Sequence, residues 1–268
     1  MSDAPQPAVP QGNPGDILNW PMLKIVYRTD ADKIAALLPP GIEPGADPHV
    51  NLTIYNFPVP DVPEYGIVTS VNADFNGIAG EYTLGYGIDQ ESAIFISQET
   101  NGQPKYPCET HYYRFMNKVA ARCTHQGYTF VEFDGESSGE LDPQDEFEQN
   151  EWWIKVSRAV SVGGPATGYD FPPHVVHVKS KYGTAHREAV NGTLLLRDSP
   201  WDPLASKLPM REQVSAHLWW PIFLDRQITL AGPLDPDGFL PFVDTISGSR
   251  WPGVNGAPAP AADPAAAA

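Results

Sequence analysis

The residue with the clearest potential for chemistry is Lys105, which stands between Pro104 and Pro107 in the segment SAIFISQETNGQPKYPCETHYY. The two prolines restrict the backbone around it, and the apolar run from Ile94 to Ile96 precedes it. If that run buries the side chain, desolvation disfavours the ammonium and leaves a neutral amine, which can attack a carbonyl carbon. Taken alone, a lysine in a loop is more often a solvated surface residue. A lysine nucleophile is therefore a hypothesis that needs support from the rest of the chain.

Several other chemistries have no matching motif. The sequence contains no GxxxxGK(S/T), GxGxxG, HExxH or GxSxG pattern, which argues against the nucleotide-binding, zinc-protease and serine-hydrolase classes that use them. His174 and His177 are three residues apart, and on a strand this spacing places them on opposite faces, so we expect no shared metal ion. Cys108 and Cys123 are expected to be ordinary reduced thiols.

The charge balance limits the partners. The 268 residues include 17 Lys and Arg against 33 Asp and Glu, a formal net charge of -16. Such a field repels phosphate backbones and anionic lipids, so we expect no nucleic-acid or membrane partner. The sequence has no long apolar window and no secretory signal pattern, which makes a cytoplasmic location the expectation.

Most of the elements that must position Lys105 have the pattern of strands. Apolar or alternating runs bounded by Gly, Pro, Asn or Asp predict strands at 49–57, 80–88, 92–99, 174–183 and 192–198. The segment IVYRTDADKIAALLPPGIEP predicts a strand that leads into a helix. Thr29 or Asp30 would cap this helix, its buried stripe would be Ile34, Leu37 and Leu38, and the two following prolines would end it.

Two further segments carry expectations of their own. Residues 132–151 are acidic and without periodicity, which predicts a solvated loop or a hairpin insertion. A helix is predicted from about Met210 to Trp220, with Val214 and Leu218 on one face and Pro221 at its end.

The ends of the chain differ in composition from its middle. Residues 1–14 and 254–268 are rich in Pro and Ala and predict disordered tails around a single domain at 15–253. The expected fold class is α+β and mostly antiparallel, with a curved sheet or β-barrel core and a few flanking helices.

Several stretches resemble the acetoacetate decarboxylase family, whose hallmark is a Schiff-base lysine in a Gly-x-Pro-Lys-Lys segment. IVYRTDADKIAALLPPGIEP resembles the family's entry segment, and FNGIAGEY at 75–82 resembles its Phe-Asn-Gly-x-x-Gly-acid-Tyr element. Lys105 follows Tyr82 by 23 residues, which is the family spacing. IDQESAIFISQE and GTLLLRDSPWDPLASKLPMREQV also match family patterns, so the resemblance covers most of residues 20–245.

The resemblance implies that Lys105 attacks the carbonyl of a keto acid, loses water and forms an iminium ion. This ion accepts the electron pair released when carbon dioxide or an aldol fragment departs, and no cofactor is needed, neither metal nor organic. Symmetric homo-oligomers are also expected, because members of the family form them.

The sequence departs from the family pattern at three places around this lysine. Tyr106 replaces the second lysine, so like-charge repulsion does not help to activate Lys105, and the Tyr106 phenol becomes a candidate proton donor. Trp20 stands where the family has an arginine and would add apolar bulk against the substrate. The family's pocket glutamate falls near Gly66, and Glu64 would replace it if the loop is shifted.

Three more residues are expected near the site or to support it. Gln103 would line the pocket if it shares a strand face with Lys105. Arg28 and Glu99 match family positions, but a structural ion pair or a capping role is the better interpretation.

Three functions follow from these residues. The leading hypothesis is a cofactor-independent Schiff-base lyase that decarboxylates a β-keto acid larger than acetoacetate. The first alternative keeps the lysine iminium but uses it as an aldolase or dehydratase acting on a 2-oxo acid. The second alternative is a small-molecule binding module in which Lys105 has lost its reactivity.

Overall fold

The computed structural model describes residues 21–59, 62–160, 168–243 and 251. Its strands are β1 (Met22–Arg28), β2 (Glu43–Pro44), β3 (His49–Val59), β4 (Val62–Phe75), β5 (Ile78–Ile88), β6 (Lys105–Pro107), β7 (Glu109–Phe115), β8 (Lys118–His125), β9 (Tyr128–Glu140), β10 (Phe147–Arg158), β11 (Tyr169–Leu196) and β12 (Glu212–Pro233). Its helices are α1 (Ala31–Ala35), α2 (Glu91–Asn101), α3 (Leu204–Lys207), α4 (Pro236–Phe239) and the 3-10 helix η1 (Leu240–Phe242). Among the described residues, no helix is long and apolar enough to cross a membrane.

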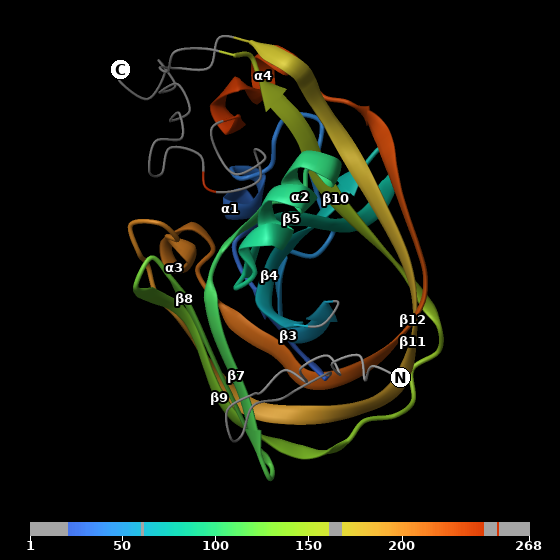
Figure 1. The fold of residues 1–268 in the computed structure, drawn as a ribbon. Helices are drawn as coiled ribbons and strands as arrows, with labels where there is room; N and C mark the ends of the chain where they lie inside the picture. Colours follow the sequence, from blue (N-terminus) through green and yellow to red (C-terminus); the bar gives the residue numbers. More distant parts are fainter. Residues whose placement is uncertain (1–20, 60–61, 161–167, 244–250, 252–268) are drawn as a thin grey trace, which may run out of the picture.

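All the described strands join one large mixed sheet. The strand order is β10-β5-β4-β3-β1-β12-β11-β9-β8-β7, with β2 on β4 and β6 on β5. Most neighbours are antiparallel, while β5 runs parallel to β10 and to β6. β10 also pairs with β11, so the series of paired strands is closed: it runs from β10 through β5, β4, β3, β1, β12 and β11 and back to β10. Figure 1 shows the long strands β11 and β12 running side by side, with α2 near β5 and β10. The predicted class, a mostly antiparallel curved sheet with few helices, is confirmed.

The two faces of the sheet around β1 differ in polarity. In β1, Leu23, Ile25 and Tyr27 are fully buried in the main hydrophobic core, as alternation along a strand requires. Lys24 lies on the other face, where it stands opposite Thr53 of β3. Tyr55 follows two residues later on that same face, so this second face carries polar side chains from several strands.

The helix expected near residue 30 is present but shorter than predicted. Asp30 is the N-cap of α1 and Ile34 is buried on it, but the helix ends at Ala35, so Leu37 and Leu38 are buried in the turn that follows and the two prolines do not end the helix. The Asp30 carboxylate accepts hydrogen bonds from Arg211 and makes no capping bond.

The strand expected at 92–99 is wrong, because these residues form α2. A short apolar run fits a strand or a buried helix equally well. The pairing of the flanking strands decides between the two. Because β5 and β6 run parallel, the segment between them must cross from one end of the sheet to the other, and such a crossover is commonly a helix. Only Ile94 of the apolar run is buried, whereas Phe95 and Ile96 are 62% and 66% exposed.

The helix expected from about Met210 to Trp220 is also wrong. From Glu212 onward these residues belong to β12, which is paired on one side with β1 and on the other with β11. Pairing with a neighbouring strand on each side overrides the local helical pattern, since strand formation depends strongly on cross-strand packing. Pro221 lies inside the strand rather than at the end of a helix.

The acidic stretch at 132–151 is largely strand rather than loop. Residues up to Glu140 extend β9 and those from Phe147 begin β10, which leaves only residues 141–146 as a connection. In β9 the buried Val131, Phe133 and Gly135 alternate with Glu132, Asp134 and Glu136, which point away from the core. The strands predicted at 174–183 and 192–198 are two parts of the single strand β11. The two predicted tails lie outside the described residues.

Candidate active site

The backbone of Lys105 is held by the turn that ends α2. Gly102 adopts a positive φ of 66° there, and a Cβ atom on it would lie 2.3 Å from the carbonyl oxygen of Ile154, so only glycine fits. The chain then enters β6, where Lys105 stands beside Tyr86 of β5. The carbonyl oxygen of Lys105 accepts a hydrogen bond from the Gln98 side chain. Both ends of the peptide segment around the lysine are therefore fixed.

The Lys105 side chain forms a buried ion pair with Glu64 of β4. Lys105 Nζ lies 3.1 Å from Glu64 Oε2, and the two side chains are only 10% and 5% exposed. The hydroxyl of Tyr55 donates a hydrogen bond of 2.8 Å to the other carboxylate oxygen, Oε1. Removing two charges from water costs free energy that only good geometry and extra hydrogen bonds offset, and the Tyr55 bond is such a contact. The three side chains bring an ammonium, a carboxylate and a phenol together in a buried site.

Glycine at position 66 makes room for this arrangement. Gly66 stands opposite Tyr55 in the pairing of β3 and β4. A Cβ atom on Gly66 would lie 2.7 Å from the Tyr55 hydroxyl oxygen. A larger side chain at this position would collide with the phenol, and the carboxylate that contacts Lys105 and Tyr55 is that of Glu64, two residues earlier on the same face of β4.

Burial sets the protonation of two groups around the pair. Desolvation, and then the negative charge of Glu64, hold the pKa of the Tyr55 phenol well above its ordinary value, so Tyr55 is a neutral donor. Burial also raises the pKa of Asp89 to about 6, the Glu64 carboxylate adding to the effect. Asp89 follows β5 directly and accepts a hydrogen bond of 2.9 Å from the backbone N–H of Tyr65.

The surroundings of the pair are apolar. Tyr55, Ile88 and Ile94 form a small buried cluster, with Met22, Val68 and Ala93 packed against it. Of the three residues expected to cover Lys105, only Ile94 is buried, because on the helix Phe95 and Ile96 turn outward.

Tyr106, the proposed proton donor, lies on the other side of β6. Successive strand residues point to opposite faces, so the Tyr106 side chain is directed away from that of Lys105. Its ring packs against His125, with ring centroids 4.8 Å apart, and His125 Nδ1 lies 2.6 Å from Asp202 Oδ2. The expectation that Tyr106 acts at the Lys105 amine is therefore corrected, and its place is in the core behind β6.

The remaining expected residues contribute in other ways. Gln103 precedes β6 instead of sharing its face, and its carbonyl oxygen accepts the backbone N–H of Lys105. Trp20 lies outside the described residues. Arg28 forms an exposed ion pair with Glu212 of β12, with atoms 3.6 Å apart, as the structural interpretation predicted. The carbonyl oxygen of Glu99 accepts a hydrogen bond from Lys155 Nζ.

Tyr55 is the member of the site that sequence reasoning missed. The strand around it was expected, but its approach to Glu64 depends on the register of β3 against β4. Alternation from Thr53 to Tyr55 in the predicted strand was the only available signal.

A metal centre is not evident in the described ranges, where no three His, Cys, Asp or Glu side chains gather as metal ligands would. His174 and His177 have separate partners, the carbonyl oxygen of Pro172 and the Oδ1 atom of Asn150.

The chain is similar in sequence to known decarboxylases. The model of the acetoacetate decarboxylase family matches residues 3–232. The acetoacetate decarboxylase of Clostridium botulinum is 32% identical over 103 residues, which are 37% of this chain and 41% of that protein. The acetoacetate decarboxylase of Paraburkholderia phytofirmans is 37% identical over 103 residues, which are 37% of this chain and 39% of that protein. These matches thus span about two fifths of the length of the relatives.

Solved structures share the fold. An acetoacetate decarboxylase aligns with a TM-score of 0.69 and 19% identity, over 84% of this chain and 91% of that one. An acetoacetate decarboxylase-like enzyme from Sphingomonas wittichii RW1 aligns with a TM-score of 0.65 and 15% identity, over 80% and 91%. The enduracididine biosynthesis enzyme MppR, complexed with pyruvate, aligns with a TM-score of 0.60 and 16% identity, over 79% and 91%.

Proposed function

Because the chain belongs to the acetoacetate decarboxylase family, we propose that it is a cofactor-independent lyase whose Lys105 forms a Schiff base with a keto acid. The observation that carries the proposal is the buried contact of Lys105 Nζ with Glu64 Oε2 at 3.1 Å. The carboxylate gives the lysine a proton acceptor within direct reach, and Tyr55 orients that carboxylate.

The reaction balances with these groups, one proton from solvent and one water. Glu64 accepts a proton from the Lys105 ammonium, and the free amine attacks the ketone carbon to form a C–N bond. The carbonyl oxygen takes up one proton from the attacking nitrogen and one from the protonated Glu64, and it leaves as water, which gives the iminium ion. The bond to the carboxylate then breaks, carbon dioxide leaves, and the electron pair moves onto the iminium to form an enamine. A proton from solvent then adds to the enamine carbon, and water hydrolyses the resulting iminium, which releases the ketone and restores Lys105.

The substrate in this proposal is a β-keto acid larger than acetoacetate. The second lysine of the family is Tyr106 here, and it lies behind β6, so Lys105 is accompanied by a carboxylate and a phenol instead of another cation. The family arginine is replaced by Trp20. Both changes remove positive charge that would hold a small carboxylate close to the amine.

Aldol or dehydratase chemistry on a 2-oxo acid is the second candidate. The same iminium can accept the electrons of an aldol cleavage, and Glu64 can move the protons. MppR has been solved with the condensation product of pyruvate and imidazole 4-carboxaldehyde, and this supports carbon–carbon bond chemistry as a possibility for the fold.

Product analysis tests which of these activities the chain has. The protein is incubated with acetoacetate, with longer β-keto acids, and with pyruvate plus an aldehyde, and carbon dioxide and condensation products are measured. The proposal expects carbon dioxide from a longer β-keto acid at a higher rate than from acetoacetate. Condensation of pyruvate without carbon dioxide release from any β-keto acid would instead establish the second candidate. A folded protein inactive with every substrate would favour the binding module.

We also propose that the chain self-associates through the outer part of β12. Ile222, Phe223, Leu224, Ile228 and Leu230 leave large apolar surfaces exposed along this strand. A second copy of the chain that covers them would form a symmetric interface.

A further inference from the structure

A polar hollow lies between β1, β4, β5, β10, β11 and β12. Its volume is about 570 Å³, within the range of pockets that enclose small organic ligands. None of Lys105, Glu64 and Tyr55 belongs to its lining, so this hollow is separate from the candidate active site.

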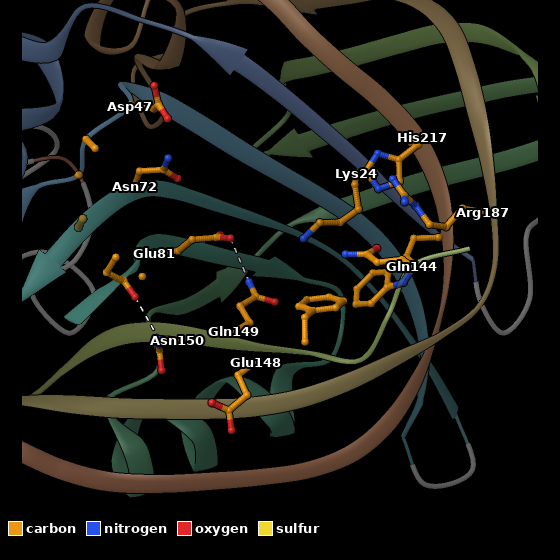
Figure 2. A pocket seen from close by; sticks show the side chains of 17 residues that line it. Lys24, Asp47, Asn72, Glu81, Gln144, Glu148, Gln149, Asn150, Arg187 and His217 are labelled. Atoms are coloured by element: carbon orange, nitrogen blue, oxygen red, sulfur yellow. Dashed lines mark hydrogen bonds between the residues drawn. The ribbon is translucent and has the colours of Figure 1, made fainter. Parts of the chain in front are cut away.

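Three basic side chains gather at one end of the hollow. In the strand pairing Lys24 of β1 stands opposite His217 of β12, and Arg187 of β11 stands opposite Trp219 of the same strand. Figure 2 shows Lys24, Arg187 and His217 close together, whereas Asp47 and Asn72 lie at the other end. The hollow is therefore polarised, with its positive charge on one side.

Lys24 and Arg187 are the permanently charged cations in the lining of the hollow. Neither Lys24 nor Arg187 forms an ion pair with a carboxylate in the part of the chain that the structure describes. Arg187 Nε is moreover a buried donor without a hydrogen-bond partner there. A buried donor without an acceptor is costly and is rare in native proteins. In a chain with a net charge of -16 this local excess of positive charge calls for an anion.

The acidic side chains that line the hollow either bond to other residues or lie far from Lys24 and Arg187. Glu81 accepts hydrogen bonds from Gln149, at 3.0 Å, and from Ser70. Glu148 is paired with Lys179 on the surface at 2.9 Å. Asp47 is exposed at the far end.

Two further titratable residues, His217 and Glu151, lie near the cations, and neither neutralises their charge. Burial lowers the pKa of His217 to about 4, and the charges of Arg187 and Lys24 add to the effect, so His217 is a neutral hydrogen-bonding group at pH 7. Glu151 of β10 also senses the charge of Lys24, but its Oε1 atom accepts a hydrogen bond of 2.9 Å from Tyr86 and it makes no ion pair with Lys24.

Two aromatic rings line the hollow beside the cations. The rings of Phe147 and Trp219 contact each other, with centroids 5.7 Å apart, and both residues line the hollow. Lys24 Nζ lies 5.8 Å from the centroid of the Trp219 ring, which sets the ammonium at the edge of this apolar surface. A ligand that matches both features has an anionic end and an apolar body.

We propose that this hollow binds a small organic carboxylate, with the acid group on Lys24 and Arg187 and the apolar body against Trp219 and Phe147. The guanidinium is planar and its paired N–H donors match the two oxygens of a carboxylate, while the ammonium adds a second charged donor. Arg187 Nε supplies the buried donor that the carboxylate satisfies.

Isothermal titration calorimetry with 3-phenylpropanoate tests the proposal, because this acid has no ketone or aldehyde group with which Lys105 could form a Schiff base. Its neutral amide, 3-phenylpropanamide, and inorganic phosphate are titrated in parallel. We expect the acid to bind at least about tenfold more tightly than either, and Lys24→Met and Arg187→Gln each to weaken it about tenfold. Arg187→Lys, which keeps the charge, should weaken it less. Lys118→Met, a surface control on β8, and Lys105→Ala should leave the affinity unchanged.

Circular dichroism of each variant establishes that it is folded before titration. The proposal is overturned if 3-phenylpropanoate does not bind at millimolar concentration, or if the amide or phosphate binds as tightly. Unchanged affinity in folded Lys24→Met and Arg187→Gln also overturns it. Loss of binding in Lys105→Ala would place the acid in the candidate active site instead.

Discussion

Lys105 Nζ and Glu64 Oε2 lie 3.1 Å apart, although 41 residues separate them in the chain. The two side chains come from β6 and β4, which both pair with β5, and the turn at Gly102 and the register of β4 against β5 bring them together. An amine whose proton acceptor is already in contact is prepared for attack on a carbonyl.

Replacing Glu64 by Gln removes that proton acceptor while keeping the side-chain shape. We expect decarboxylation to slow by about 100-fold or more, the usual contribution of general acid–base catalysis. Steady-state assays of carbon dioxide release measure this, with the surface variant Glu43→Gln as the matched control. Equal rates in Glu64→Gln and the unaltered protein would remove Glu64 from the mechanism.

Gly66→Ala tests the close approach that lets Tyr55 reach Glu64. Because the new methyl group would lie 2.7 Å from the Tyr55 hydroxyl and 2.9 Å from the Gly87 carbonyl oxygen, we expect a loss of about 1–3 kcal/mol in the free energy of unfolding. Urea denaturation measures it. Gly168→Ala is the control, since the nearest atom to its new methyl is 4.0 Å away. If the free energy of unfolding falls equally in both variants, the close approach of Tyr55 does not restrict position 66 to glycine.

Asp89 should give the stability a specific pH dependence. Its pKa is about 6 in the folded protein against an ordinary 3.8, so the native state holds the proton more tightly than the unfolded chain. This carboxyl therefore lowers stability as pH rises from about 4 to about 6, and the loss persists above that range. Asp89→Asn, whose amide oxygen can still accept the N–H of Tyr65, should be more stable than the unaltered protein at pH 7.

Urea denaturation at pH 4 and pH 7 measures the difference between the two proteins. The stabilisation by Asp89→Asn should be present at pH 7 and nearly absent at pH 4. A difference of the same size at both values would mean that the ionisation of Asp89 is not its source.

Parts of this arrangement could be predicted from the sequence, and the parts that failed have a common cause. The start of α1 was predicted because its N-cap Asp30 and the buried Ile34 are local signals, whereas its end at Ala35 comes before the two prolines that were expected to stop it. α2 and β12 were misassigned because their type is decided by neighbouring strands, a parallel crossover in one case and pairing on both sides in the other. The contact of Tyr55 with Glu64 depends on register for the same reason.

Self-association through β12 should be visible in solution. Size-exclusion chromatography with light scattering is expected to give a mass above 29.3 kDa for the unaltered chain. Phe223 is 50% exposed, so Phe223→Asp would place a charge in the proposed interface. This variant should shift the mass toward that of the monomer. A monomeric unaltered chain would contradict the proposed interface.

Borohydride trapping tests the central proposal most directly. The protein is incubated with acetoacetate, pyruvate and longer keto acids, reduced, and analysed by intact mass and peptide mapping. The account predicts an adduct that depends on the keto acid and maps to Lys105, is absent in Lys105→Ala, and is retained in the surface control Lys118→Ala. An adduct confined to other lysines, or no adduct with any keto acid in the folded protein, would contradict it.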